Sequence, residues 1–223
     1  MKLSKATLNI LKNFASINPS IYLRKGSVIA TKSIDNVIYA EAKIDDLIDA
    51  DVGVYDVSEF LSIIGLFSAD DVEIISKTAD LEVQIKDKRS AVNYTVVDPS
   101  VIIFPAKYAT FPAASVHFEL SEADLERLIK AANALGLPEI QFSSEKGKIV
   151  AKAVDPKDES ANDYVMELAD YDGSNEFVYA MKVENMKMVK GNYHVQTFMD
   201  KAMKFEGENI TYIIAVESTS TFA

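Results

Sequence analysis

The sequence predicts an α+β fold with antiparallel sheets, made of two similar domains. The first observation is an internal repeat, because residues 3–11 (LSKATLNIL) are similar to residues 120–128 (LSEADLERL), slightly more than half the chain later. The second is that many short segments alternate apolar and polar residues, as half-buried strands do. The third is that 48% of the residues are hydrophobic, which is enough to bury a core in each of two domains of about 110 residues.

The composition limits the functions that the chain can have. It carries a formal net charge of −11, no cysteine and two histidines. Without cysteine there is no disulfide or thiolate nucleophile, and two histidines are too few for the common metal and acid–base clusters. The negative charge argues against ordinary electrostatic binding to nucleic acid, so a DNA contact requires a locally basic surface. The sequence has no apolar run of ~18 residues and no leader, and we expect a soluble, cytoplasmic protein.

The first half begins with an amphipathic helix over residues 4–16, for which Ser4 is the expected N-cap. Leu8, Leu11 and Phe14 fall on one side of this helix, and lysine and other polar side chains fall on the opposite side. The elements expected after it are strands around a glycine turn at 22–29, a strand at 37–44, a helix at 56–65 ended by glycine, and strands at 71–76, 81–86 and 91–97.

A proline-rich segment follows these strands. Pro99, Pro105 and Pro112 exclude a helix and make a central strand improbable. We therefore expect an extended connector that keeps apolar side chains exposed. The predicted division of the chain is an N-terminal domain at 1–98, the connector at 99–115 and a C-terminal domain at 116–223.

The second half repeats this order of elements after a strand at 116–120. Ser121 is the expected N-cap of its helix, Asp124 stands at the capping-box position, and Gly136 ends the helix. The apolar face of the helix is predicted to consist of Leu125, Leu128, Ile129, Ala132 and Leu135. The remaining expected elements are strands near 139–144, 147–153, 163–169 and 176–182, a short helix at 185–188, and strands at 192–197, 202–206 and 210–217. Each half then contains two helices.

Several segments, taken in their order along the chain, resemble the sliding clamps of T-even-type bacteriophages, the processivity factors of the replicative polymerase. These segments are residues 2–5, 11–15, 39–56, 170–173, 186–188, 191–193 and 204–208. The resemblance implies a head-to-tail homotrimer closed into a ring around duplex DNA, with six similar domains. It implies antiparallel sheets on the outside and two helices per domain facing the ring interior.

The resemblance also implies how such a ring works. A clamp has no catalytic activity and no cofactor; an ATP-dependent clamp loader places it on DNA, where it tethers the DNA polymerase. Late-transcription factors are further partners that the resemblance allows. The implied location is the cytoplasm of the infected bacterial host, with no membrane association.

Two lysines on the first helix are the leading candidates for DNA contact. Lys5 and Lys12 lie seven residues apart on its polar face, with no acid between them. From sequence alone a solvated helix face is the more common explanation, whereas the resemblance implies that they face DNA. In the second half, Glu126 lies close to two further candidate cations. The complete set of predicted DNA-facing residues is Lys5, Lys12, Arg127, Lys130, Lys187 and Lys190.

The connector carries the candidate partner site. Its apolar side chains belong either to the core or to a pocket for short hydrophobic tails of the polymerase and the clamp loader. Phe222, next to the last residue, is a further candidate for this pocket. The predicted pocket residues are Ile102, Ile103, Phe104, Tyr108, Phe111 and Phe222.

Two other functions compete with the clamp. One is a duplicated β-rich assembly or virion protein without a role on DNA. The other is a metal-dependent phosphodiesterase that uses Asp170, Asp172 and Glu176, although a hairpin turn explains these residues better because Glu176 comes too early for an EF-hand. No common catalytic motif is present, so the sequence predicts a non-enzymatic clamp without catalytic residues or a metal site.

Overall fold

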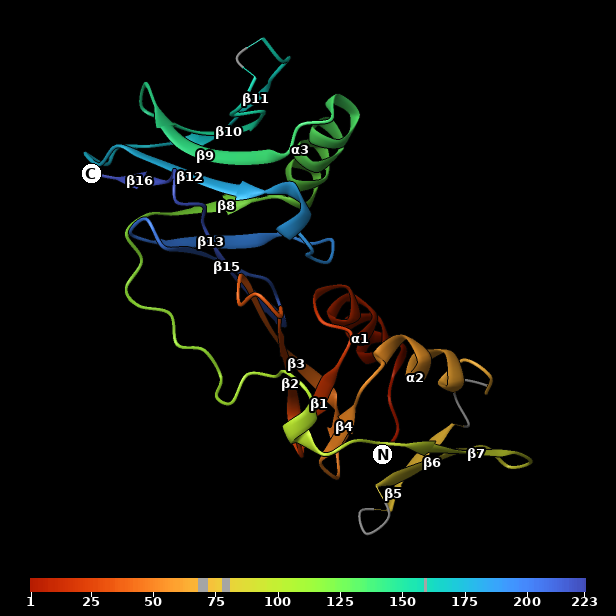
Figure 1. The fold of residues 1–223 in the computed structure, drawn as a ribbon. Helices are drawn as coiled ribbons and strands as arrows, with labels where there is room; N and C mark the ends of the chain where they lie inside the picture. Colours follow the sequence, from red (N-terminus) through yellow and green to blue (C-terminus); the bar gives the residue numbers. More distant parts are fainter. Residues whose placement is uncertain (68–71, 78–80, 159) are drawn as a thin grey trace. The chain divides into compact units, whose positions relative to one another are not determined.

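In this computed structural model, residues 1–67, 72–77, 81–158 and 160–223 are described (Figure 1). The chain divides into two units, Met1–Ala109 and Thr110–Ala223, and the predicted connector at 99–115 spans the point of division. Within the described residues, no helix has the length and apolar character needed to cross a membrane.

Among its described residues, the first unit contains two α-helices and three sets of antiparallel strands. The pairs are β1 with β4 and β2 with β3, and a meander is formed in the order β5-β6-β7. Helix α2 packs beside α1 (Figure 1). The elements are α1 (Lys5–Ile17), β1 (Ile21–Leu23), β2 (Gly26–Lys32), β3 (Ile38–Ile48), β4 (Val52–Val54), α2 (Val57–Ile64), β5 (Glu73–Lys77), β6 (Glu82–Lys86), β7 (Ala91–Thr95) and a 3₁₀ turn, η1 (Pro99–Val101).

Helix α1 begins where its capping chemistry predicts. The side chain of Ser4 accepts a hydrogen bond from the Thr7 amide at 3.3 Å, which satisfies a backbone donor that has no partner within the helix. The backbone amide of Ser4 in turn donates to Asp46 at 2.7 Å, so that the helix start is anchored to β3. The buried side chains of α1 are Thr7, Ile10, Leu11, Phe14 and Ile17.

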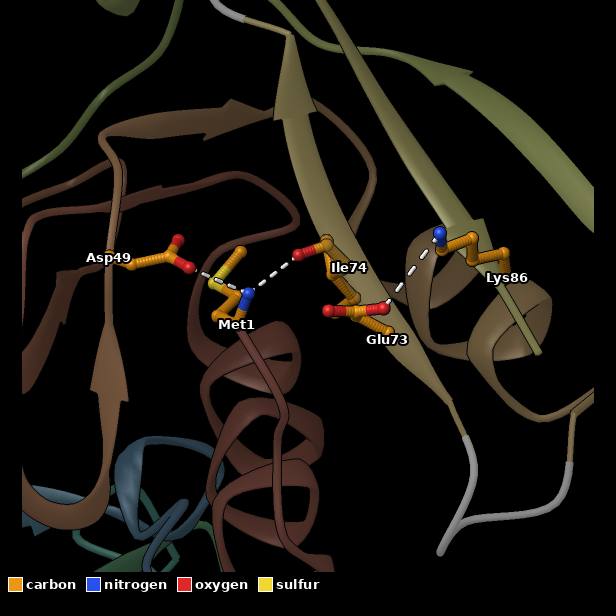
Figure 2. A network of polar contacts seen from close by, with 5 residues as sticks. All are labelled: Met1, Asp49, Glu73, Ile74 and Lys86. Atoms are coloured by element: carbon orange, nitrogen blue, oxygen red, sulfur yellow. Dashed lines mark hydrogen bonds and ion pairs between the residues drawn. The ribbon is translucent and has the colours of Figure 1, made fainter. Parts of the chain in front are cut away.

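The segment ahead of α1 is anchored to strand β5 and to the residue that follows β3. Figure 2 shows the α-amino group of Met1 between Asp49 and Ile74. The group donates to the Asp49 carboxylate at 2.8 Å and to the Ile74 carbonyl at 2.6 Å. Glu73 and Lys86, on the paired strands β5 and β6, form a longer ion pair at 3.9 Å beside it (Figure 2). These contacts connect the start of the chain to the β5-β6-β7 meander.

The described part of the second unit contains α3 and two antiparallel sheets. The strands pair in the orders β11-β10-β9-β12-β16 and β15-β14-β13-β8. The elements are β8 (His117–Leu120), α3 (Glu122–Leu135), β9 (Glu139–Glu145), β10 (Lys148–Val154), β11 (Tyr164–Asp170), β12 (Phe177–Lys182), the 3₁₀ turn η2 (Val183–Asn185), β13 (Tyr193–Phe198), β14 (Ala202–Glu206), β15 (Ile210–Ala215) and β16 (Thr221–Phe222).

The prediction of two helices in each half is wrong for the second half. Among its described residues this unit has one α-helix, and the expected helix at 185–188 is replaced by the single turn η2. A difference in capping accounts for this. Asp56 caps α2 by accepting from the Glu59 amide at 3.0 Å, whereas Lys182, in the same place before η2, makes no capping hydrogen bond with its side chain.

Helix α3 follows its predicted boundaries, with one error on its apolar face. Ser121 caps it by accepting from the Asp124 amide at 3.1 Å, and Gly136 ends it in the left-handed conformation, with φ of 68°. Leu125, Leu128 and Ala132 are buried as predicted and Ile129 is half-buried, but Leu135 is 44% exposed. As the last residue of the helix, Leu135 lies where the chain already turns toward β9.

The two units repeat the same backbone contacts, which confirms that the internal repeat is structural. The amide of Val57 donates to the Pro19 carbonyl at 2.8 Å, and the amide of Val183 donates to the Pro138 carbonyl at 2.9 Å. A second contact is matched just after the last long strand of each unit: the amide of Val97 donates to Gly53 at 2.9 Å, and the amide of Glu217 donates to Ala180 at 2.8 Å. The elements α1-β1-β2-β3-β4-α2-β5-β6-β7 therefore correspond to α3-β9-β10-β11-β12-η2-β13-β14-β15.

Candidate nucleic-acid interface

Helix α1 presents a basic face that contains no acid. Lys5 and Lys12 are both exposed, and at 100° per residue they lie opposite Phe14, which is buried. Two turns of helix separate them, about 10.5 Å along the axis. No aspartate or glutamate occurs in α1, so both charges face solvent without an acid on the same helix.

The carboxylate of Asp46, which anchors the start of α1, is held in its ionised form. Burial by itself raises the pKa of Asp46, but hydrogen bonds from Thr7 and Ser4 outweigh it and hold that pKa below its ordinary value. The carboxylate lies at the positive end of the α1 dipole, where a negative charge is favourable. Asp46 therefore fixes the helix start that carries Lys5.

Helix α3 presents a basic face on which one acid binds two of the cations. Glu126 forms an ion pair with Lys130 at 3.1 Å and a second, shorter ion pair with Lys190. The hydrogen bonds from Lys190 and Lys130 lower the pKa of Glu126. Arg127 is exposed on the same side of the helix. Glu122, one turn before Glu126, is a second acid on this side of the helix and is exposed. Three cations therefore face two acids, and the positive charge of this surface is weaker than the cations alone suggest.

The structure groups some of the predicted DNA-facing residues within each unit. Lys5 and Lys12 share α1, and Glu126 brings Lys190 of the segment after η2 to Lys130 of α3. Lys187 is exposed in that same segment. Helix α2 (VSEFLSII) contributes an acid and no cation, so the basic charge of the first unit's helices lies on α1.

Two of the predicted pocket residues, Phe104 and Tyr108, lie against Arg24, which was not among the predicted site residues. The guanidinium of Arg24 lies 5.4 Å from the ring centroid of Phe104 and 5.8 Å from those of Tyr22 and Tyr108, and it donates to the carbonyl of Pro105. We call Tyr22, Arg24, Phe104, Pro105 and Tyr108 the Arg24 cluster. The alternation Tyr22-Leu23-Arg24 was a usable signal, since residues i and i+2 of a strand share a face.

The other predicted pocket residues lie elsewhere. Ile102 is buried in the first unit, while Ile103 is 42% exposed and accepts a hydrogen bond from the Asn18 side chain at 2.9 Å. In the second unit, the ring of Phe111 lies 6.3 Å from that of Phe198, and Phe222 pairs with Phe177 in the β16–β12 register. The structure thus joins Phe104 and Tyr108 in one cluster and does not join all six residues.

The acidic residues around Asp170 make an ordinary ion pair and an ordinary backbone hydrogen bond. Asp170 forms an ion pair with Lys148 at 2.5 Å, which lowers the pKa of Asp170, and the backbone amide of Glu176 donates to the Ala223 carbonyl at 3.1 Å. Throughout the part of the chain that the structure describes, no group of three or more metal-ligating side chains is placed to hold an ion.

The sequence matches two family models that together span most of the chain. Residues 2–104 match the model described as DNA polymerase processivity factor, and residues 117–218 match that of the gp45 sliding clamp, C terminal. The chain is 44% identical to the sliding clamp of Escherichia phage RB69 and 40% identical to that of Enterobacteria phage T4. Each alignment covers 99% of both chains.

Solved structures with much lower sequence identity share the fold. The A. fulgidus PCNA that was solved with the C-terminal region of FEN-1 is similar with a TM-score of 0.70 at 18% identity, over 94% of each chain. PCNA from Thermococcus kodakaraensis gives a TM-score of 0.71 at 12% identity, over 97% of this chain and 98% of that one. The family models, the phage relatives and the fold agree, and the chain belongs to the sliding clamp family of DNA polymerase processivity factors.

Proposed function

We propose that three copies of this chain close head to tail into a ring around duplex DNA and tether the replicative polymerase. The observation that carries the DNA contact is the acid-free face of α1, with Lys5 and Lys12 exposed on a chain of net charge −11. A closed ring holds DNA by topology, so weak phosphate contacts are enough and strong ones would slow sliding. The acidic remainder of the surface repels DNA and keeps it away from other faces.

Ring closure is proposed to use edge strands. Strand β7 ends the β5-β6-β7 meander, and β11 ends the sheet of the second unit. Val165 on β11 is 51% exposed, and an exposed apolar residue on an open edge favours pairing with another chain. Pairing β7 of one subunit with β11 of the next makes a heterologous contact, which closes into a ring when the rotation per subunit fits.

The Arg24 cluster is proposed to receive hydrophobic tails of the polymerase and the clamp loader. Tyr108 is 47% exposed, so aromatic surface is available beside the guanidinium. The related A. fulgidus PCNA was solved with the C-terminal region of another protein, which is consistent with capture of terminal peptides by this fold. Loading by an ATP-dependent loader, engagement of late-transcription factors and action in the cytoplasm of the infected host complete the proposal.

The mass of the protein in solution tests the ring. Light scattering on a sizing column is expected to give about three times the chain mass of 24.6 kDa, falling to one chain for Val165→Lys but not for the exposed control Ile34→Lys. A monomer at all concentrations contradicts ring closure.

The DNA contact is tested separately from ring closure. Lys5→Glu combined with Lys12→Glu is expected to keep the trimer and to lose stimulation of the polymerase on a primed circular template. The exposed strand residue Lys43 provides the control, Lys43→Glu. Equal stimulation by both variants contradicts the assignment of α1 to DNA.

A further inference from the structure

The second unit has a groove at the C-terminal end of α3. Its volume is about 990 Å³, within the size range of ligand sites, and every residue that lines it belongs to this unit. Leu137, Pro138 and Val183 form part of its apolar floor. The groove shares no residue with the Arg24 cluster, which belongs to the first unit. The acidic residues that line the groove are Glu139, Asp155, Glu184 and Glu217.

The internal repeat indicates what kind of molecule fits there. In the first unit, the corresponding place beside Pro19 is occupied by the chain that leaves the unit. The side chain of Asn18 donates to the Ile103 carbonyl at 2.9 Å, and Arg24 donates to the Pro105 carbonyl. An extended, proline-containing segment therefore lies against the end of α1. Because Pro19 corresponds to Pro138 in the repeat, the residue that corresponds to Asn18 is Leu137.

In the second unit the departing chain takes another course. After the amide of Glu217 has donated to Ala180, the Ser220 hydroxyl accepts from the Ala180 amide at 3.0 Å. The next residues, Thr221 and Phe222, then pair with β12 as β16. The tail is thereby directed to the outer edge of β12, and the groove that the first unit fills with its own chain opens to solvent here.

The charge of the groove sets the chemistry of its occupant. Where the first unit offers the Asn18 side-chain amide as a donor to a connector carbonyl, the second offers four carboxylates against two lysines, Lys157 and Lys182. Lys182 is already paired with Glu184 at 4.0 Å. Glu139 is only 7% exposed and accepts from the Gln141 side chain at 2.7 Å. A buried carboxylate is stabilised by a positive charge brought near it.

We propose that this groove is a docking site for an extended peptide segment of a partner protein, with apolar residues flanked by lysine or arginine. The apolar side chains of the peptide would pack on Leu137 and Val183, and its lysine or arginine side chains would pair with Glu184 and Glu217 at the rim of the groove. The site does not depend on ring closure or on DNA binding, so it stands apart from the function proposed above.

Peptides derived from the connector sequence test the proposal. The probe is a fluorescent peptide with the sequence of residues 99–108 in which Ser100→Lys and Ala106→Lys add charge, and its counterpart carries Ser100→Glu and Lys107→Glu. Fluorescence anisotropy with the full chain at low salt is expected to show binding of the basic peptide only. Glu184→Lys combined with Glu217→Lys is expected to weaken that binding about tenfold. Asp200→Lys combined with Glu208→Lys, at two exposed turn positions outside the groove, changes the charge by the same amount and is expected to leave the binding unchanged.

The proposal is overturned by absence of binding to the folded chain, by equal binding of both peptides, or by equal weakening by the control. Backbone amide NMR shifts locate the peptide, with changes expected at Val183 and Thr219. Changes confined to Tyr22 and Tyr108 mean that the probe displaces the connector, which also rejects the groove. The mass of the same sample by light scattering reports ring formation separately, so that failure of one proposal is distinguishable from failure of the other.

Discussion

Glu126 on α3 accepts a hydrogen bond from Lys190, a residue that lies beyond four intervening strands in the chain. The same carboxylate is paired with Lys130, one turn further along the helix. One acid therefore holds two of the cations that are proposed to meet DNA. Because both lysines are about three-quarters exposed, the arrangement controls how much positive charge the surface presents rather than how stable the fold is.

Glu126→Gln is expected to strengthen association with DNA. The change removes one negative charge and releases Lys130 and Lys190 to contact phosphates, so the slope of log affinity against log salt is expected to become steeper by roughly 1 to 2. Anisotropy of a labelled duplex over a range of salt concentrations measures this slope. Glu208→Gln removes an exposed acid away from α3, and an equal response to both variants contradicts a specific role for Glu126.

The boundaries of α1 and α3 could be predicted because their signals are local. Ser4 and Ser121 are N-caps that act within one turn, and Gly136 ends its helix through its own backbone freedom. The prediction of a helix at 185–188 was wrong because it relied on the apolar pattern alone. The residue before η2 makes no capping hydrogen bond with its side chain.

The interactions that define the sites could not be predicted because they join distant segments. The pairing of Glu126 with Lys190 depends on the course of the chain after η2, and the Arg24 cluster depends on the connector returning over β1. Residue types alone did identify Phe104 and Tyr108 as a candidate site, but not the cation between them. The groove beside Pro138 became visible only when the two units were compared as structures.

Arg24→Ala is expected to destabilise the first unit by about 1–3 kcal/mol. The change removes the cation from three aromatic rings and the donor that satisfies the Pro105 carbonyl. Urea unfolding followed by circular dichroism measures the loss. Lys25→Ala, at the next and exposed position, is the control, and Arg24→Lys is expected to fall between the two because it keeps charge but loses the planar guanidinium. Equal stability of Arg24→Ala and Lys25→Ala contradicts the importance of the cluster.

Asp46 is expected to give the first unit a stability that depends on acid pH. Its pKa in the folded chain lies below the ordinary value of 3.8, so the unfolded chain binds the proton more readily. The contribution is therefore fully present above that ordinary value and is lost as the pH falls through the lower, folded-state pKa. Urea unfolding at neutral pH and near pH 3 is expected to show a smaller pH effect for Asp46→Asn than for the unchanged chain.

The neighbouring residue supplies the control for this measurement. Asp45 is exposed on β3, so Asp45→Asn changes the net charge by the same amount without touching the start of α1. If both asparagine variants lose stability equally at neutral pH, the hydrogen bonds from Thr7 and Ser4 are not the cause.

Gly53 is expected to tolerate no side chain, although its counterpart in the second unit is an alanine. A Cβ at this position would lie 2.2 Å from the Val97 carbonyl oxygen, on the segment whose amide donates to Gly53 at 2.9 Å. Gly53→Ala therefore forces the start of the connector away from β4, at an expected cost of about 1–3 kcal/mol. The reciprocal change, Ala180→Gly, removes a methyl group and is expected to cost less, about 0.5–1 kcal/mol. Thermal unfolding of the two variants compares them directly. A Gly53→Ala protein as stable as the unchanged chain would mean that the connector leaves the first unit by a path other than the one through Val97.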